Sequence, residues 1–338
     1  MVAAKGRLFD ERNTMKPVVV RPYQLMCIVC RQAAGFDGDP RDAKLKAMLA
    51  AIRKKPERPV SLCCNVDTTY DFQNPGIEDD TPEGDLYNVK RDLDILQRLG
   101  LAPGATHPAR DLFFRLLKKI TSARGICGYG NTDADPWKGC AFAGSGNYEK
   151  GVAAGVAAII PPRDQKQKER AKKKSVRAMY EAATLDIRPH HFMCMTCFHG
   201  GQEKISPIAV DNLFEAIDII RKNPEIPVRL VKACTCMICP PCHSWNPKIS
   251  KCVSTCSLRD QKKDLDVLQK TGLKFGDVLP AREFLNKLYA AISSTKEICG
   301  CGDGVATSFE WDGCGMQGNE GYVKGRAAGM GVPGVTVE

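Results

Sequence analysis

The segment VRPYQLMCIVC at residues 20–30 returns as IRPHHFMCMTC at residues 187–197, and this repeated block decides how the chain is organised. Four more blocks recur in the same order. They are residues 52–62 and 220–230, 90–101 and 262–273, 109–130 and 281–302, and 137–151 and 311–325. Ordered self-similarity of this kind is the sequence signature of an internal duplication.

The chain is therefore expected to divide into two homologous domains, at residues 16–160 and 184–330, joined by a basic segment at residues 161–183. Between Arg163 and Arg177, eight Lys or Arg residues stand against two acids. We interpret this segment as a solvated linker or exposed helix; the alternative is a docking surface for an acidic partner protein. Its charges are not interleaved with the aromatic residues that base stacking needs, which argues against a nucleic-acid partner.

Hydrophobic periodicity predicts that each domain is mainly α. Apolar residues recur every three or four positions in three pairs of segments: residues 43–54 and 207–222, 86–99 and 258–268, and 107–120 and 280–292. The middle pair ends at Gly100 and Gly272, as helices often do. Residues 59–62 and 227–230 are extended at most. We expect two small helical domains, each organised around cysteine-ligated metal, with the cysteines mainly in loops and at helix ends.

The 338 residues include 17 cysteines, an odd number that excludes complete disulfide pairing. Each domain is large enough to bury a core, so neither needs disulfides for stability. The N-terminus carries charges throughout and has no signal-peptide pattern, and no apolar run approaches the ~20 residues of a membrane helix. We therefore expect a protein of a reducing or anaerobic cytoplasm, not bound to a membrane, whose grouped cysteines hold metal.

Aligning the two halves sorts the cysteines into shared and surplus positions. The shared pairs are Cys27 with Cys194, Cys30 with Cys197, Cys127 with Cys299, and Cys140 with Cys314. Cys63 or Cys64 falls roughly opposite Cys234, and we favour Cys64 as the ligand because neighbours in an extended chain point opposite ways. The second half has a surplus: Cys236, Cys239, Cys242, Cys252, Cys256 and Cys301.

The surplus includes Cys236, Cys239 and Cys242 in a CxxCxxC motif. This spacing lets three thiolates bind one face of a four-iron cluster, and a fourth ligand is available among the other cysteines. We predict two or three 4Fe–4S clusters held by the shared and surplus cysteines. Four thiolates also suit tetrahedral zinc, which stays as the alternative, and three or four cysteines are expected to be buried and inert.

Several other residues attract attention around the first CxxC motifs. His190 and His191 are interpreted as a polar helix start after Pro189; the alternative is a hydrogen bond to a cluster thiolate, or proton transfer, near Cys194. Arg21 and Arg188 occur in both copies, where they either pair with acids or balance the charge of a cluster. The glycine-rich tails, at residues 144–155 and 313–331, lack a phosphate-loop motif and are expected to pack closely against a cluster.

The second half resembles a known family. IRPHHFMC at residues 187–194, CMICPPC at 236–242 and RDQKKDLDVLQKTGLKFGDVLPAREFL at 259–285 are similar to the uncharacterised iron–sulfur-binding-like family called domain of unknown function 1284. The resemblance implies cluster ligands at Cys194, among residues 234–242, and at Cys299 or Cys301. It implies no reaction. The first half resembles a diverged copy that lacks both histidines.

We therefore predict an iron–sulfur protein that transfers electrons between its duplicated domains and a docked redox partner protein, which the basic segment would favour if it is acidic. Two alternatives stay open. In one, a cluster in the second domain keeps an open iron site and acts as an enzyme, with His190 or His191 as proton donor. In the other, zinc stabilises a binding module.

Overall fold

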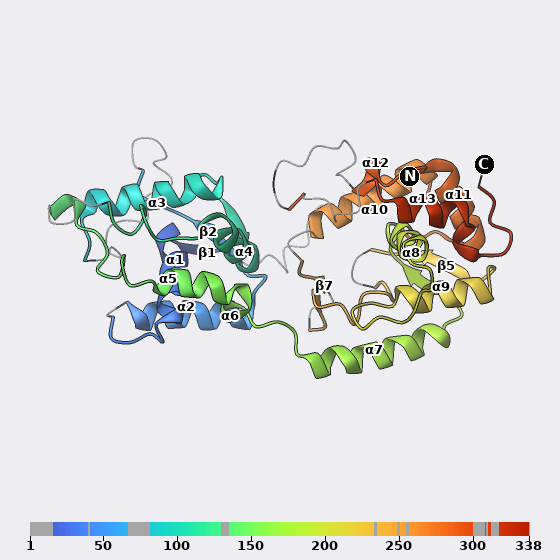
Figure 1. Cartoon of the computed structure of the whole chain (residues 1–338), viewed down its shortest axis with the longest axis horizontal. Coiled ribbons are helices and arrows are strands. Elements are labelled where there is room, and N and C mark those ends of the chain that lie inside the picture. The colour runs from blue at the N-terminus through green and yellow to red at the C-terminus, as the bar shows by residue number, and fades with distance from the viewer. Residues whose placement is uncertain are drawn as a thin grey trace, which may run out of the picture. The chain divides into compact units, whose positions relative to one another are not determined.

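The computed structural model describes residues 16–39, 41–66, 82–129, 135–232, 235–248, 251–254, 257–299, 308, 310–311 and 318–337. The chain forms two compact units, Met1–Pro161 and Pro162–Glu338. Helices dominate both units (Figure 1), which confirms the prediction of a mainly α fold. None of the helices in the described ranges is long and apolar enough to cross a membrane.

The first unit is built on a small sheet of order β1-β2-β3. Strands β1 (Val18–Val20) and β2 (Pro59–Leu62) are parallel, and β3 (Thr106–Pro108) is antiparallel to β2. Parallel strands need a long crossover, which two helices provide here. The helices are α1 (Pro22–Ala33), α2 (Asp42–Lys54), α3 (Asp85–Leu99), α4 (Ala109–Lys119), α5 (Asn147–Ala154) and α6 (Val156–Ile159), with a 3-10 turn at Asp135–Trp137.

The second unit has a sheet with the same strand order and directions. Strands β4 (Leu185–Ile187) and β5 (Pro227–Leu230) are parallel, and β8 (Val278–Pro280) is antiparallel to β5. A short hairpin, β6 (Trp245–Asn246) and β7 (Lys251–Cys252), follows β5. The helices are α7 (Gln165–Tyr180), α8 (His191–Gly200), α9 (Leu213–Lys222), α10 (Ser257–Thr271), α11 (Ala281–Ala291), α12 (Lys296–Cys299) and α13 (Glu320–Ala327), with a 3-10 turn at Gly329–Gly331.

The helices predicted from periodicity form close to their expected limits. In α3, for example, Ile95, Leu96 and Leu99 are buried, and the helix ends at Gly100, whose φ of 66° is the left-handed conformation that glycine favours. The largest shift is in α9, which begins at Leu213 and not near residue 207. Each unit has a separate apolar core that includes residues of its own sheet and helices.

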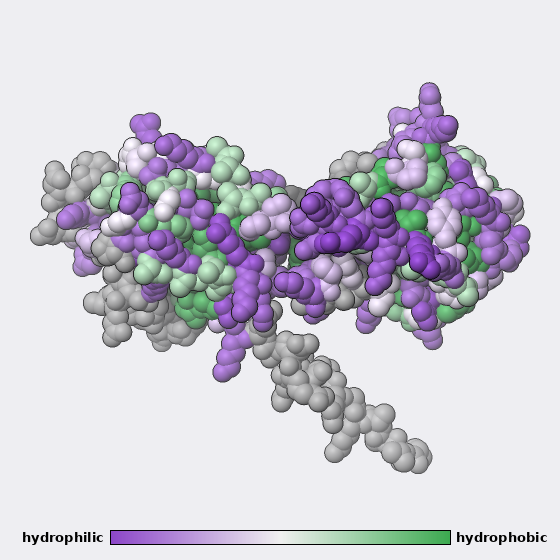
Figure 2. Space-filling model, turned by 90° about the horizontal axis from the view of Figure 1, so that it is seen from below, coloured by the Kyte–Doolittle hydropathy of each residue, from purple (hydrophilic) through white to green (hydrophobic). Residues whose placement is uncertain are grey.

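Of the two interpretations of the basic segment, a solvated linker or an exposed helix, the helix is observed as α7, and it belongs to the second unit. Helix α7 contacts α9, and Lys172 Nζ lies 2.7 Å from a carboxylate oxygen of Glu215. Met179 is fully buried, and the Asn212 side chain donates to Ser175 Oγ at 2.8 Å. The many charged side chains of α7 lie on the outer face of this helix, which is strongly hydrophilic (Figure 2).

The glycine-rich tails form helices that pack against the CxxC helices. Helix α5 lies against α1, and α13 lies against α8 (Figure 1). A Cβ atom on Gly151 would stand 2.6 Å from Val29 Cγ1, and one on Gly325 would overlap the carbonyl oxygen of Thr196. The close packing expected of these tails is therefore observed against a helix backbone, and glycine is needed because no side chain fits.

Candidate metal centres

In the first unit, the CxxC motif lies within helix α1. Pro22 occupies the first helical turn, where its missing N–H costs nothing, and Gln24 Oε1 accepts a hydrogen bond from the Arg21 N–H at 2.9 Å. Cys27 and Cys30 are three residues apart, so their side chains share one face of the helix. The cysteines were expected mainly in loops and at helix ends, whereas these two lie inside a helix. The helix places both thiols in a defined direction.

Two further thiols from later loops join this face. The Cys140 N–H donates to the Cys127 carbonyl oxygen at 3.0 Å, which joins the two loop segments. Burial raises the pKa of Cys127, and Cys27, Cys140 and Cys30 raise it further. These Coulombic effects indicate that the four thiols lie in one region of the first unit. The structure therefore brings together four of the predicted ligands.

Two arginines lie beside this four-thiol site. Burial is the main reason that the pKa of Cys27 is raised to about 12, while Arg91 and Arg41 oppose the rise. Arg91 is 2% exposed, and its guanidinium carbon lies 3.9 Å from the ring centroid of Tyr23. Cations beside these half-buried thiols offset the negative charge that the sulfurs would carry as metal ligands.

The corresponding thiols of the second unit also lie together. Cys194 and Cys197 are within α8, and Cys299 ends α12. All three line one cavity of about 620 Å³, together with residues of α13 such as Lys324. The fourth shared position, Cys314, lies outside the described residues. Three of the four aligned cysteine positions therefore lie in the same part of each unit.

The second unit has another group of thiols in the loop after β5. Cys239 N–H donates to the Cys236 carbonyl oxygen at 3.3 Å, and Cys242 N–H donates to that of Cys239 at 2.9 Å, so the CxxCxxC segment turns tightly. Cys252 of β7 lies near Cys239 and Cys242. It raises the pKa of Cys239, and its own pKa is raised mainly by burial, with Cys242 among the groups that also raise it. Four surplus cysteines thus gather at this site.

His191 reaches this second group. Its Nδ1 atom lies 3.2 Å from Cys236 Sγ, and His191 Nδ1, Cys236 Sγ and Cys239 Sγ all lie within 4.8 Å of one another. Burial raises the pKa of Cys236, but hydrogen bonding to Cys239 and the nearby His191 hold it well below its usual range. The preferred interpretation of the two histidines, a polar helix start after Pro189, is confirmed, because α8 begins at His191. The alternative, a hydrogen bond from a histidine to a thiol, is also present, although the thiol is Cys236 and not Cys194.

His190 has a different position and is not close to the sulfurs in this way. Its Nδ1 atom lies 2.7 Å from Asp264 Oδ1, and burial lowers its pKa to about 4. Arg188 also binds Asp264, from Nη2 to Oδ2 at 2.7 Å, and Arg21 binds Asp92 in the first unit at the same distance. Of the two roles considered for these arginines, pairing with an acid is observed in both units. These two aspartates could have been found from the sequence, because Asp92 and Asp264 stand at the same position of the repeated 90–101 and 262–273 blocks.

The two kinds of site differ in the spacing of their ligand atoms. A tetrahedral zinc ion with Zn–S bonds of about 2.3 Å places its sulfurs about 3.8 Å apart. Only His191, Cys236 and Cys239 approach this spacing among the described residues; no three of the first unit's four shared thiols all lie within 4.8 Å of one another. In a four-iron cluster each thiolate binds a different iron, so its ligand sulfurs stand farther apart. The group of His191, Cys236 and Cys239 therefore has a spacing that suits a single ion.

Other predicted ligands are elsewhere. Cys64 is fully buried, and after burial itself, the groups that shift its pKa are Asp92, Arg21 and Cys63, not the four shared thiols. The strand registers align it with Lys232. The structure therefore does not bring Cys64 to the four-thiol site. The remaining predicted ligands, Cys234, Cys256 and Cys301, lie outside the described residues, as Cys314 does.

The chain matches no family model, no curated protein and no solved structure. The resemblance in the second half therefore stays a prediction.

Proposed function

We propose that the two units are homologous copies and that each holds a 4Fe–4S cluster at its shared thiol site. The common strand order and directions support a duplication, as does the buried Arg–Asp pair in each unit. The ligands would be Cys27, Cys30, Cys127 and Cys140 in the first unit, and Cys194, Cys197, Cys299 and Cys314 in the second. The convergence of four half-buried thiols from one helix and two loops carries this proposal.

The proposed activity is electron transfer in a reducing cytoplasm. A bound cluster would supply a one-electron redox centre. The protein's own residues bury the thiols, hold them in fixed directions and place Arg91 and Arg41 beside them, and such charges help to set a redox potential. None of the described cysteines is in a disulfide, as ligation in a reducing compartment requires. The basic outer face of α7 is the proposed docking surface for an acidic redox partner.

A second candidate role applies to the loop site of the second unit. The tight group of His191, Cys236 and Cys239, with Cys242 and Cys252 nearby, favours one tetrahedral ion, and a histidine–cysteine donor set suits zinc. In that case the site would stabilise the loop after β5. If it holds iron and sulfide, it is the third cluster.

Metal analysis of the full chain tests the proposal. We expect protein purified without oxygen to be brown and to contain iron and acid-labile sulfide in equal amounts, in multiples of about four per chain. Cys127→Ser should remove about one cluster's iron, whereas Cys63→Ser, at a half-buried thiol outside the shared set, should leave the iron content unchanged. A colourless protein with stoichiometric zinc and no sulfide would contradict the proposal.

A further inference from the structure

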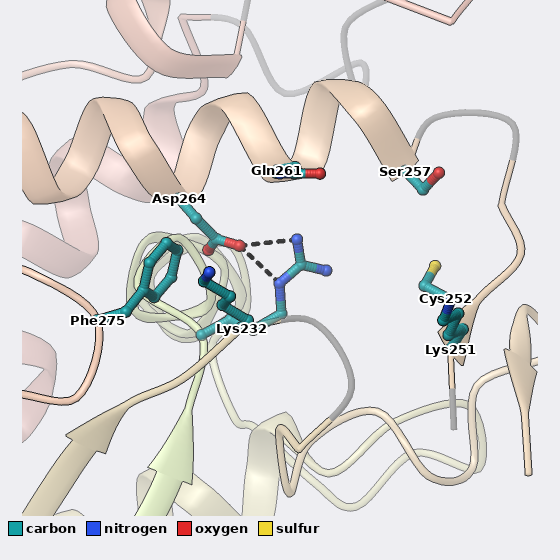
Figure 3. Close-up of a pocket in the computed structure, with 8 residues that line it drawn as sticks. Lys232, Lys251, Cys252, Ser257, Gln261, Asp264 and Phe275 are labelled. Atoms are coloured by element: carbon teal, nitrogen blue, oxygen red, sulfur yellow. Dashed lines mark hydrogen bonds and ion pairs between the residues drawn. The ribbon is translucent and has the colours of Figure 1, made fainter. Parts of the chain in front are cut away.

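A cavity of about 270 Å³ opens in the second unit beside the loop site (Figure 3). Helix α10 forms one wall with Ser257, Gln261 and Asp264, which the helical repeat places along one side. Lys251 and Cys252 of β7 lie at one end of the cavity, while Lys232 and Phe275 lie at the other (Figure 3). The volume is at the small end of ligand pockets, so only a small molecule fits.

The lining of this cavity is positively charged. Arg188, Lys232 and Lys251 contribute three cations against the single carboxylate of Asp264. That carboxylate is already engaged, because Asp264 Oδ2 accepts from Arg188 Nε at 2.8 Å and Oδ1 lies 2.7 Å from His190 Nδ1. Both lysines are exposed and available, whereas Arg188 is only 3% exposed and is held in place by its ion pair. Because Asp264 balances the charge of Arg188, the two exposed lysines attract an anion, and Arg188 offers N–H donors in a fixed position.

The cavity also has an aromatic surface. Lys232 Nζ lies 5.5 Å from the ring centroid of Phe275, which keeps the ammonium group and the ring at the same end of the cavity. Ser257 and Gln261 add a hydroxyl and an amide that can donate hydrogen bonds. An anionic oxygen group next to a planar apolar part complements these three features.

The first unit lacks this lining, although it keeps the underlying Arg–Asp pair. The strand registers align Lys232 with Cys64, and the repeated blocks align Gln261 with Val89 and Phe275 with Pro103. The lysine, the amide and the ring are each replaced by a residue that cannot bind an anion in the same way. The charged pocket is therefore an addition to the second unit and not a consequence of the shared frame.

We propose that this pocket is a binding site for a small organic anion, with its carboxylate or phosphate group on Lys232 and Arg188, its planar part on Phe275, and Lys251 adding positive charge from the other end of the cavity. None of these four side chains is a proposed metal ligand, so the binding does not depend on the proposed function. Because Cys252 lines the same cavity, the bound anion would lie beside the loop site. A role as the substrate of that site does rest on the proposed function.

Calorimetric titration of the full chain tests the site, with benzoate, phenyl phosphate and inorganic phosphate as probes. We expect at least one aromatic anion to bind with a Kd of about 1 mM or tighter, more weakly as salt is added. Whether benzoate or phenyl phosphate binds better identifies the anionic group. Lys232→Gln and Lys251→Gln should each weaken binding about tenfold, and Phe275→Ala should abolish the preference for phenyl phosphate over inorganic phosphate.

Lys166→Gln is the matched control, because it removes the same charge from the exposed face of α7. Binding that is absent in the native chain, or weakened equally by Lys166→Gln, would overturn the proposal. Circular dichroism checks that each variant is folded. Iron, sulfide and zinc are measured on the same samples, so a failure of anion binding is distinguished from a failure of the proposed metal function.

Discussion

The two units share a frame but differ at the end of the second strand. In the first unit, the chain after β2 places Cys64 in the core next to the Arg21–Asp92 pair. In the second, the aligned segment after β5 leads into a loop with four gathered cysteines and a basic pocket. The shared frame therefore accounts for one thiol site per unit. The loop after β5 accounts for the second thiol site and the basic pocket, which only the second unit has.

The strongest test of the shared frame removes the acid of each buried ion pair. Asp92→Ala and Asp264→Ala each leave a buried arginine without its partner, which typically costs about 3–5 kcal/mol of folding free energy. Denaturant unfolding measures the loss. Asp266→Ala is the control, since its pair with Lys262 is partly exposed and should cost no more than about 0.5 kcal/mol. A large loss in only one unit would break the comparison.

The next test addresses the helix packing beside the thiols. Gly151→Ala and Gly325→Ala each force α5 or α13 away from its CxxC helix, and we expect a loss of about 1–3 kcal/mol of folding free energy together with lower iron content. Gly144→Ala should change neither, because a Cβ there meets no atom within 4 Å. Unchanged stability in both packed variants would show that the helices do not need this close approach.

A smaller effect is expected at the boundary of the second unit. Lys172→Ala leaves the buried carboxylate of Glu215 unpaired, which should cost about 1–3 kcal/mol of folding free energy in thermal or denaturant unfolding. Arg177→Ala on the same helix should cost about 0.5 kcal/mol or less, because its pair with Glu181 is exposed. Equal effects of the two substitutions would restore the interpretation of residues 161–183 as a linker.

Much of the fold could be predicted because most helices have one buried face. Helix α1 was not predicted because eight of its twelve residues, including Arg31, are buried, so it shows no apolar stripe. Helices α5 and α13 were not predicted because their glycines indicate coil locally. Only the backbone of the neighbouring helix explains why glycine is required there.

Part of each candidate site could also be predicted from the sequence. Aligning the repeated blocks placed Cys127 and Cys140 in the same set as the first CxxC, because each has an aligned cysteine in the second half. The contact between His191 and Cys236 could not be predicted, since it depends on the path of the loop after β5. Cys64 was favoured as a ligand because neighbours in an extended chain point opposite ways, but the sequence does not show that its side chain is buried near Asp92.

The central claim is that one thiol site, with one kind of cluster, recurs in both units. It is tested most directly by Mössbauer spectroscopy and by iron and sulfide analysis of anaerobically purified Cys30→Ser and Cys197→Ser, which alter the same shared position in each unit. We predict that each variant loses about one 4Fe–4S cluster and that the iron left behind has the same spectrum in both. Loss of zinc, or no change of metal in one of the two variants, would contradict the claim.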